Sequence, residues 1–329
     1  MENFKQLFRD FTEIKVGVLG DVMLDTYMWG EVDRISPEAP VPIVALKKKD
    51  YRVGGAGNVA LNLQSLGARS YLISVTGNDV ESRKLQELLT DQQISAQYCF
   101  ASNKRITTTK TRVISRNQHM LRLDAELLND LDNEDQEKLL LNFQNFVKEE
   151  KPHVVILQDY NKGVLTENVI EKAIAICKQH NIITTVDPKR KNFLSYKNVD
   201  VFKPNLKEVK EALNLLFTEP NLHILQDIHA ELAHLLDHKI SFITLSEKGV
   251  FYQLGEQSAI IPSHLRNIAD VSGAGDTVIA VASLVYAATG NPFLMAEIAN
   301  IAGGLVCEEV GTVAINRHTL LHECELLLS

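Results

Sequence analysis

Short runs of β-branched and apolar residues alternate with longer helical segments along most of this chain, and no other feature constrains its fold as strongly. Strands are predicted at residues 15–19, 70–75, 153–157, 182–186, 242–245 and 250–254. Helices are predicted at residues 58–66, 80–92, 167–180, 207–217, 223–237 and 278–288. Strands that alternate with helices form a parallel sheet with helices on both faces. We therefore expect an α/β fold with a mostly parallel central sheet.

Two insertions, residues 27–52 and 107–123, interrupt this alternation. The first contains three prolines and a strand-like run at residues 41–46, and the second is extended and has no helix signals. Neither fits a strand–helix unit, so we expect both to supply extra strands for a small β lid beside the main sheet. A flap over a ligand site and a subunit interface are both suitable roles for such strands. We expect residues 1–329 to form one domain that includes this lid.

The composition argues against several classes of protein. A net charge of −8 without a basic stripe argues against nucleic acid as a partner. No apolar run reaches the length of a membrane span, and residues 1–5 lack the apolar core of a signal sequence. The four cysteines are isolated along the chain, which favours reduced thiols over disulfides or zinc ligands. We expect a cytoplasmic protein without a membrane partner.

The segment Gly273-Ala274-Gly275-Asp276 stands directly before the apolar helical run at residues 278–288. Small residues at a helix start leave backbone N–H groups bare, and the helix dipole adds positive charge there. Such a turn suits an anion such as a phosphoryl group. Asp276 would then lie where a catalytic base for a substrate hydroxyl is needed. The alternative is an ordinary glycine-rich N-cap with an acidic first turn.

Two further segments carry polar residues at helix starts. Gly54 and Gly55 permit close approach to the backbone just before a predicted helix, and Asn58 offers a donor and an acceptor there. Simple loop geometry is the alternative. Asn205 and Glu208 have the spacing of a capping box, and they also suit a site for nucleotide phosphates and a magnesium–water shell. No Gly-x-x-x-x-Gly-Lys-Ser/Thr loop is present, so ATP would need another phosphate cradle.

These motifs, in their order, resemble those of the ribokinase family of carbohydrate kinases. The matching motifs are Gly54-Gly55 with Asn58, Asn205 with Glu208, Thr244-Leu245 with Gly249, and Asp270 with Gly273-Ala274-Gly275-Asp276. The resemblance covers essentially the whole chain. It implies a ribokinase-like three-layer sandwich and an ATP-dependent carbohydrate kinase.

Within that family the chain is most similar to the D-glycero-β-D-manno-heptose 7-phosphate kinases. Residues 34–42, 111–118, 159–163 and 186–189 carry this finer resemblance. It implies phosphorylation of the anomeric hydroxyl to the 1,7-bisphosphate in the ADP-heptose pathway, which supplies lipopolysaccharide core precursors. Many such relatives carry a second, nucleotidyltransferase domain with a His-x-Gly-His motif. The chain lacks this motif, so the resemblance is to a stand-alone kinase.

The resemblance also implies roles for individual residues. Asp276 would take the proton of the sugar hydroxyl. The transferred phosphoryl group would lie against the backbone of Gly273, Ala274 and Gly275. The sugar hydroxyls would be bound by Asp25, Gly54, Gly55 and Asn58. The nucleotide would be bound by Asn205, Glu208, Ser246, Gly249 and Asn300. Glu208 would hold Mg²⁺ through water, and Asp270 and Ser272 would border a potassium ion.

Cations on two loops are the expected partners of the sugar phosphate. Lys162 follows the predicted strand at residues 153–157, and Lys189 follows the one at residues 182–186, where Arg190 and Lys191 extend a local cluster. Ligands of α/β sheets bind at the carboxyl ends of parallel strands, which is where both loops lie. The alternative is that these cations are solvated loop charges.

The expected substrates are therefore a sugar phosphate and ATP, with Mg²⁺ and also K⁺ as cofactors, and the expected assembly is a homodimer formed through the lid. Two rivals remain open. One is a ribokinase-like kinase for another sugar, sugar phosphate or nucleoside, and the other is a catalytically silent sugar-binding or regulatory protein. A dinucleotide oxidoreductase is disfavoured because the Gly-x-Gly-x-x-Gly fingerprint is missing.

Overall fold

An eight-stranded sheet with the order β14-β13-β12-β11-β10-β9-β1-β4 forms the centre of the computed structural model, which describes residues 3–116, 118–264 and 266–328. Its strands are β1 (Lys15–Gly20), β4 (Arg69–Ile73), β9 (Val154–Gln158), β10 (Ile183–Asp187), β11 (Val201–Phe202), β12 (Ile240–Thr244), β13 (Val250–Leu254) and β14 (Gln257–Ile261). The six strands from β4 to β12 pair in parallel, whereas β13 and β14 pair antiparallel at one edge. The mostly parallel sheet is thus confirmed.

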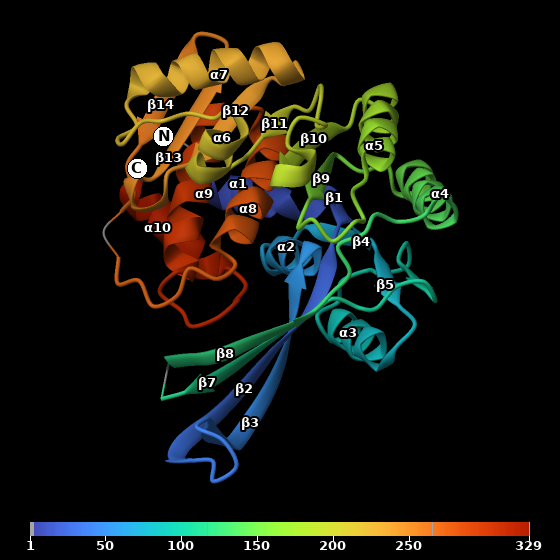
Figure 1. Ribbon diagram of the computed structural model, residues 1–329. Helices are drawn as coiled ribbons and strands as arrows, with labels where there is room; N and C mark the ends of the chain where they lie inside the picture. The colour runs from blue at the N-terminus through green and yellow to red at the C-terminus, as the bar shows by residue number, and fades with distance from the viewer. Residues whose placement is uncertain (1–2, 117, 265, 329) are drawn as a thin grey trace.

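Helices cover both faces of this sheet (Figure 1). One face carries α1 (Phe4–Asp10), α2 (Ala56–Ser65), α8 (Ala274–Thr289), α9 (Pro292–Val306) and α10 (Arg317–Leu327). The other face carries α4 (Asn133–Glu150), α5 (Glu167–Gln179), α6 (Leu206–Ala212) and α7 (Leu222–Leu236). Each set packs against the sheet through one continuous cluster of buried apolar side chains. In β9, Val154 and Ile156 face one cluster and Val155 and Leu157 the other, as the two-residue period of a strand requires. The three-layer α/β sandwich is confirmed.

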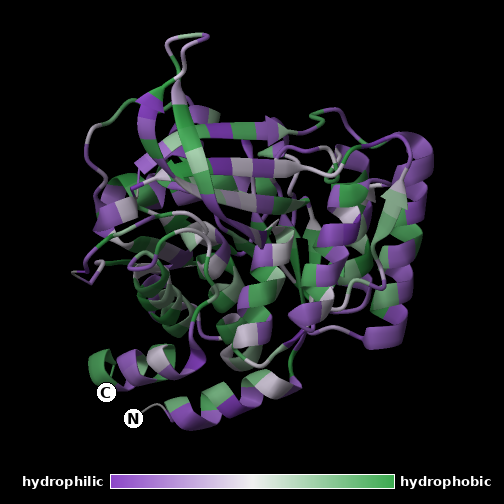
Figure 2. Cartoon of the chain, turned by 90° about the horizontal axis from the view of Figure 1, so that it is seen from below, coloured by the Kyte–Doolittle hydropathy of each residue, from purple (hydrophilic) through white to green (hydrophobic). Residues whose placement is uncertain are grey.

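A smaller sheet with the order β3-β2-β7-β8 projects from this body (Figure 1). Its strands are β2 (Val22–Ile35), β3 (Pro42–Gly55), β7 (Thr109–Ser115) and β8 (Gln118–Ala125). They supply the strands expected in residues 27–52 and 107–123, but β2 begins at Val22 and β3 ends at Gly55, because their pairing continues into the body. Gly54 and Gly55, which precede α2, therefore end a strand and do not form a separate loop. Figure 2 shows apolar and polar residues alternating along these strands.

Two predicted elements differ from those observed. The strand at residues 70–75 is interrupted at Ser74, whose hydroxyl donates to the carbonyl oxygen of Gly20 at 2.6 Å. The chain then forms β5 (Val75–Gly77), followed by α3 (Val80–Asp91) and β6 (Phe100–Ser102). Strands β5 and β6 pair with each other in parallel. The helix at residues 207–217 ends at Ala212, because Asn214 adopts a left-handed backbone conformation with φ of 52°.

The structure also contains elements that the sequence patterns did not predict, among them α1, α4, α10 and β14. Helices α1 and α10 pack together, so the two ends of the chain lie side by side (Figure 2). Residues 1 and 2, from the segment 1–5 that was compared with a signal sequence, lie outside the described residues. Residue 117, from the insertion at residues 107–123, also lies outside them. Within the described ranges, no helix has both the length and the apolar character that a membrane span requires.

Candidate active site

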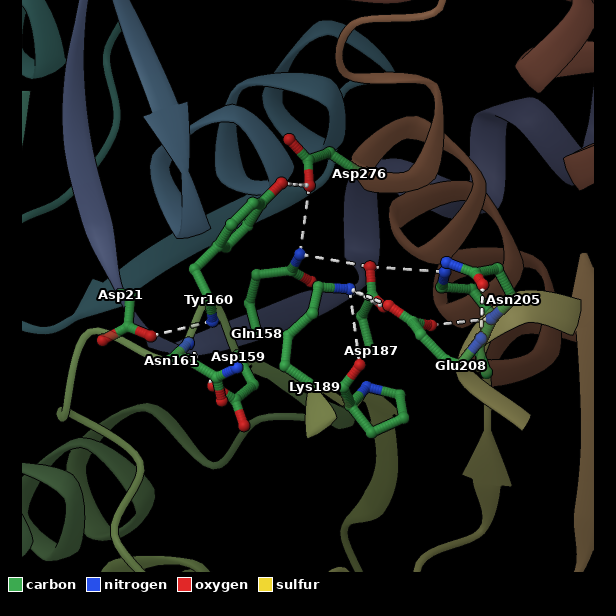
Figure 3. A network of polar contacts seen from close by, with 12 residues as sticks. Asp21, Gln158, Asp159, Tyr160, Asn161, Asp187, Lys189, Asn205, Glu208 and Asp276 are labelled. Atoms are coloured by element: carbon green, nitrogen blue, oxygen red, sulfur yellow. Dashed lines mark hydrogen bonds and ion pairs between the residues drawn. The ribbon is translucent and has the colours of Figure 1, made fainter. Parts of the chain in front are cut away.

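Polar side chains gather where the parallel strands of the main sheet end. Gln158 is the last residue of β9, Asp187 is the last of β10, and Lys203 follows β11. Asp276 reaches them from the first turn of α8. Figure 3 shows Gln158, Asp187 and Asp276 joined into one network of polar contacts, and Lys203 pairs with Asp187 at 3.3 Å. The carboxyl ends of parallel strands are the ligand-binding edge of an α/β sheet, so this network marks the candidate active site.

Asp276 is a carboxylate held by three side chains in a buried position, with an exposed fraction of 2%. Its Oδ1 accepts hydrogen bonds from the hydroxyl of Tyr160 at 2.6 Å and from Nε2 of Gln158 at 3.0 Å. Its Oδ2 accepts one from Nδ2 of Asn58 at 2.8 Å. Burial raises the pKa of Asp276 to about 6, although the hydrogen bonds from Tyr160 and Asn58 act in the opposite direction. Such a carboxyl group is ionised at neutral pH and can take a proton, as a general base must.

The start of α8 leaves space next to its backbone. Gly273 is the N-cap and has φ of 83°, a conformation that glycine adopts without strain. The first N–H groups of a helix have no acceptor inside the helix, and among them Ala274 donates to the carbonyl oxygen of Val271 at 3.3 Å. A Cβ atom on Gly275 would come no closer to another residue than 3.8 Å, to Oδ2 of Asp187. The open side of the helix start thus faces the polar network.

Asp25 and the glycines that end β3 lie where the smaller sheet leaves the body. Asp25 is buried and pairs with Nη1 of Arg112 at 2.8 Å. A Cβ atom on Gly54 would lie 2.7 Å from Oδ2 of Asp25, so a glycine is needed for Asp25 to occupy this position. Gly55 has φ of 60°, and a Cβ atom there would lie 2.3 Å from the carbonyl oxygen of Asp21. Close packing of β2 against β3 accounts for both glycines.

Two amide oxygens near Asp276 are free to accept hydrogen bonds. The orientation of the Asn58 amide follows from its neighbour, because a carboxylate only accepts and must face the NH₂ group. The NH₂ group of Gln158 likewise faces two carboxylates, Asp276 at 3.0 Å and Asp187 at 3.3 Å. Asn58 Oδ1 and Gln158 Oε1 are consequently buried without a hydrogen-bond donor among the described residues. Buried acceptors of this kind suit the hydroxyl groups of a polyol.

Asn205 and Glu208 form the capping box that their spacing allows. The side chain of Asn205 accepts from the backbone N–H of Glu208 at 2.8 Å, and Oε2 of Glu208 accepts from the N–H of Asn205 at 2.8 Å. The other carboxylate oxygen of Glu208 pairs with Nζ of Lys189 at 2.8 Å. Both oxygens of Glu208 are engaged, so the residue fits a magnesium ion held through water better than one coordinated directly.

Lys189 links this capping box to the centre of the site. Its Nζ also lies 3.0 Å from Oδ1 of Asp187, whose other oxygen is 3.3 Å from Nζ of Lys203. Burial opposes ionisation of Asp187, but the two ammonium groups outweigh it, and the pKa of Asp187 lies below its usual value. Lys189 is thus neutralised by two carboxylates. It joins Asp187, and through it Gln158 and Asp276, to Glu208.

Gly249 and Asn300 lie against residues 261–263, and the carbonyl oxygen of Ser246 accepts from the N–H of Gly249 at 3.1 Å. Ser246 is exposed in the short 3₁₀ turn after β12. A Cβ atom on Gly249 would lie 2.0 Å from the carbonyl oxygen of Ile261, and Nδ2 of Asn300 donates to the carbonyl oxygen of Pro262 at 2.9 Å. Asn205 forms an isolated bridge with Thr244, the last residue of β12, so the capping box and this group lie at the same end of the sheet.

Asp270 and Ser272 belong to the loop that leads into α8. One carboxylate oxygen of Asp270 accepts from the N–H of Ser272 at 2.9 Å, and the other accepts from the N–H of Gly311 at 2.9 Å. Asp270 thereby ties two loops together. Its remaining acceptor positions are hard oxygen donors, which suit a monovalent cation, but a structural role alone also accounts for its contacts.

The other cations expected to meet a sugar phosphate have partners of their own or lie on the surface. Lys162 is mostly buried and pairs with Glu126 at 2.7 Å. Lys191 pairs with Asp130 at 2.6 Å, and Arg190 is exposed in a 3₁₀ turn.

One cation that the sequence interpretation missed, Lys110 on β7, lies close to the site. Its ammonium group is 5.1 Å from the ring centroid of Tyr160, and within the described part of the chain it has no ion pair or hydrogen bond. Burial lowers the pKa of Lys110; the nearby charges of Lys162 and Arg112 act in the same direction, and that of Asp25 opposes them. A partly buried cation beside two others, without a direct partner, favours binding of an anion.

Several residues of the network were not assigned a role from the sequence, namely Asp21, Gln158, Tyr160, Asp187 and Lys203. Each of them ends a strand of the main sheet or lies within two residues after one, and that position is the signal that could have identified them. Asp21 accepts hydrogen bonds from the N–H groups of Tyr160, Lys162 and Val164 at 2.8–3.1 Å and so anchors the loop after β9. Burial and the neighbouring charge of Asp159 raise the pKa of Asp21 to about 6.

Solved structures of known kinases share this fold. Phosphofructokinase-2 from Escherichia coli, in complex with substrates and products, superposes with a TM-score of 0.79 at 17% identity, covering 96% of this chain and all of that one. Arabidopsis thaliana ribokinase, complexed with ribose and ATP, gives a TM-score of 0.70 at 16% identity, covering 94% of this chain and 98% of that one. At these identities the likeness concerns the fold, and it agrees with the ribokinase-like sandwich expected from the sequence.

Relatives with higher identity share most of this chain. The bifunctional protein HldE of Aliarcobacter butzleri is 39% identical over 90% of the chain and 61% of its own length, and that of Methylobacillus flagellatus is 39% identical over 94% and 62%. The chain thus spans less than two thirds of these relatives. The model of the pfkB family carbohydrate kinases matches residues 14–319. The expected sugar kinase class is confirmed, and the chain belongs to the pfkB family of carbohydrate kinases.

Proposed function

We propose that this kinase transfers the γ-phosphoryl group of ATP to the anomeric hydroxyl of D-glycero-D-manno-heptose 7-phosphate. The product is the 1,7-bisphosphate, an intermediate on the way to ADP-heptose, and the reaction takes place in the cytoplasm. The relatives named HldE support this choice of sugar, but they are bifunctional and longer than this chain. The single observation that supports a phosphorylated sugar is Lys110, a partly buried cation close to the network around Asp276. Among the described residues it has no ion pair or hydrogen bond.

The residues of the network suit the transfer. Asp276 takes the proton of the anomeric hydroxyl, while Asn58 Oδ1 and Gln158 Oε1 accept hydrogen bonds from neighbouring hydroxyls. The transferred phosphoryl group lies against the first N–H groups of α8, where the helix dipole and the bare donors stabilise its developing charge. Magnesium, held through water by Glu208, would neutralise charge on the nucleotide phosphates. We therefore expect an excess of chelator to abolish turnover.

The sugar's own phosphate is bound at the other end of the site. Lys110 and Arg112 reach it from β7, and Lys162 reaches it from the loop after β9. Arg112 pairs with Asp25, and Lys162 pairs with Glu126. Each cation thus has one carboxylate partner and keeps further N–H donors for the phosphate oxygens. This grouping explains why a site for the sugar phosphate includes a strand of the smaller sheet.

Replacement of Lys110 tests this proposal. Lys110→Met keeps the aliphatic stem over Tyr160 but removes the charge. A charge-assisted hydrogen bond contributes about 1.5–3 kcal/mol, so the KM for heptose 7-phosphate should rise roughly ten- to a hundredfold while the KM for ATP stays unchanged. Lys138→Met is the matched control. Lys138 lies on α4, and its Nζ is 4.2 Å from the ring centroid of Phe100, so this change also removes a cation from an aromatic ring. Equal KM values in the Lys110 variant and the parent would contradict the phosphate site.

A panel of acceptor sugars distinguishes heptose 7-phosphate from other possible substrates. The parent is assayed with heptose 7-phosphate, the same heptose without phosphate, fructose 6-phosphate and ribose. We expect turnover with heptose 7-phosphate to exceed that with free heptose at least tenfold. Faster turnover of an unphosphorylated sugar would refute the proposed substrate and leave the kinase class intact.

The smaller sheet also suits a lid and a dimer interface. Large apolar side chains are exposed on its strands, namely Ile35, Leu46, Met120, Leu121 and Leu123, and Val41 is exposed in the connection between β2 and β3. An exposed edge strand with apolar residues favours pairing with another chain. We propose that a second copy of this chain covers these residues. Potassium activation, by a cation at Asp270 and Ser272, is a further expectation from the family resemblance.

A further inference from the structure

Tyr160 occupies a fixed position between three parts of the site. Its backbone N–H donates to Asp21 at 2.8 Å, and its hydroxyl donates to Oδ1 of Asp276 at 2.6 Å. Its ring lies 5.1 Å from Nζ of Lys110 and 5.8 Å from Nζ of Lys189. One of these cations comes from the smaller sheet and the other from the loop after β10. Figure 3 shows the ring of Tyr160 pointing from the loop after β9 toward Asp276.

The two oxygens of Asp276 are used unequally. Oδ1 accepts from both Tyr160 and Gln158, whereas among the described residues Oδ2 accepts only from Asn58. A carboxylate oxygen can accept about two hydrogen bonds, so the free position of this carboxylate is on Oδ2. That position lies beside the Asn58 amide, whose Oδ1 is itself a buried acceptor with no donor in the part of the chain that the structure describes. A sugar hydroxyl can therefore donate to Oδ2 while its neighbour donates to Asn58.

We propose that Tyr160 is a positioning residue for the base: its hydroxyl holds Oδ1 of Asp276, so that Oδ2 faces the sugar, and it favours the ionised carboxylate. The inference rests on the role of Asp276 as the base in the proposed function. A phenol hydroxyl binds a carboxylate more strongly than a carboxylic acid, so it stabilises the form that can accept a proton. The two cations near the ring, Lys110 and Lys189, draw electron density from it and strengthen its hydroxyl as a donor.

The charges around Asp276 leave its pKa dependent on the hydrogen bond from Tyr160. Asp187 disfavours ionisation of Asp276, and Lys189 favours it, but Lys189 is already shared between Asp187 and Glu208. Burial and the adjacent Asp276 raise the pKa of Tyr160 well above its usual value, so the phenol keeps its proton and remains a donor. Because the hydrogen bond from Tyr160 lowers the pKa of Asp276, we expect loss of this donor to raise that pKa.

The test is the pH profile of kcat/KM in Tyr160→Phe, measured with ATP and heptose 7-phosphate. Loss of a hydrogen bond to a charged group corresponds to a shift of about one pH unit, so the acid limb should move upward by that amount. The variant should be about fivefold slower than the parent at pH 6 and within about twofold of it at pH 8.5. The second ionisation of the sugar phosphate falls in the same range, but it is common to both proteins.

Tyr196→Phe is the matched control. Its hydroxyl donates to Oδ2 of Asp159 at 2.7 Å, so the change removes the same group from another buried tyrosine–carboxylate pair. Its acid limb should stay where that of the parent lies. An unshifted limb in Tyr160→Phe, or an equal loss at every pH, would overturn the inference. If Asp276→Asn retains full turnover, the base itself is assigned wrongly; if that variant is inactive and the Tyr160 limb is unmoved, only the role of Tyr160 fails.

Discussion

Asp276 is the residue on which the chemistry of this site depends. Replacement of Asp276 by Asn removes the proton acceptor and keeps the size of the side chain. We expect the fold and ATP binding to persist while kcat falls about 10²–10⁴-fold, the usual effect of losing a general base. Kinetics together with ATP-dependent thermal stabilisation would check this. Turnover within about threefold of the parent would show that another group takes the proton.

A substitution at Gly275 distinguishes an anion-binding helix start from an ordinary one. A methyl group at this position finds open space, with its nearest neighbour 3.8 Å away at Asp187. Alanine in place of a helical glycine adds about 0.5–1 kcal/mol to the free energy of unfolding. Gly275→Ala should therefore melt at the same or a higher temperature but turn over substrate much more slowly, because the methyl group occupies space that the phosphoryl oxygens need. A stable variant with unchanged kcat would contradict the anion-binding role.

At the scale of an element, the start of α6 combines a cap with a proposed nucleotide site, and two variants separate these roles. Asn205→Ala removes the cap and should cost about 1 kcal/mol of unfolding free energy. Asn205→Asp keeps a good cap but places a negative charge near the nucleotide phosphates. We expect both variants to raise the KM for ATP, and only the alanine variant to lower stability in urea unfolding. If Asn205→Asp binds ATP as the parent does, the capping box accounts for Asn205 entirely.

The same capping box shows why a local motif needs its surroundings. The hydrogen bonds between Asn205 and Glu208 are those of any capped helix. What sets this helix start apart is Lys189, which arrives from the loop after β10 and joins Glu208 to Asp187. The spacing of two residues could not predict that contact, because it joins segments that only the sheet brings together.

At the scale of the whole molecule, the smaller sheet sets the expected assembly. Leu121 and Leu123 lie two residues apart on β8, and both are exposed. We expect the parent to sediment as a dimer and the double variant Leu121→Asp, Leu123→Asp to sediment as a monomer, because burying two carboxylates in an apolar interface is unfavourable. Leu216→Asp is the control, since Leu216 is 97% exposed outside this sheet. A monomeric parent would rule out the lid dimer.

The sequence by itself determined the layers of this protein. Strand runs such as 153–157 and helical runs such as 278–288 report local periodicity, which depends only on neighbouring residues, and the structure has elements at both places. The residue types of Gly273 to Asp276 predicted a helix start with an acidic first turn for the same reason, and the structure has one. Family motifs indicated the kinase class because they occur in a fixed order along the chain.

Only the tertiary structure decided how these residues meet. Tyr160, Gln158 and Asn58 converge on Asp276 from more than a hundred positions away, as their hydrogen bonds show. Lys189 is bound between Asp187 and Glu208, and Lys110 approaches the site from the smaller sheet. The physical reason is that the polarity of a side chain is local, whereas its partners depend on which strands and loops the sheet order places side by side.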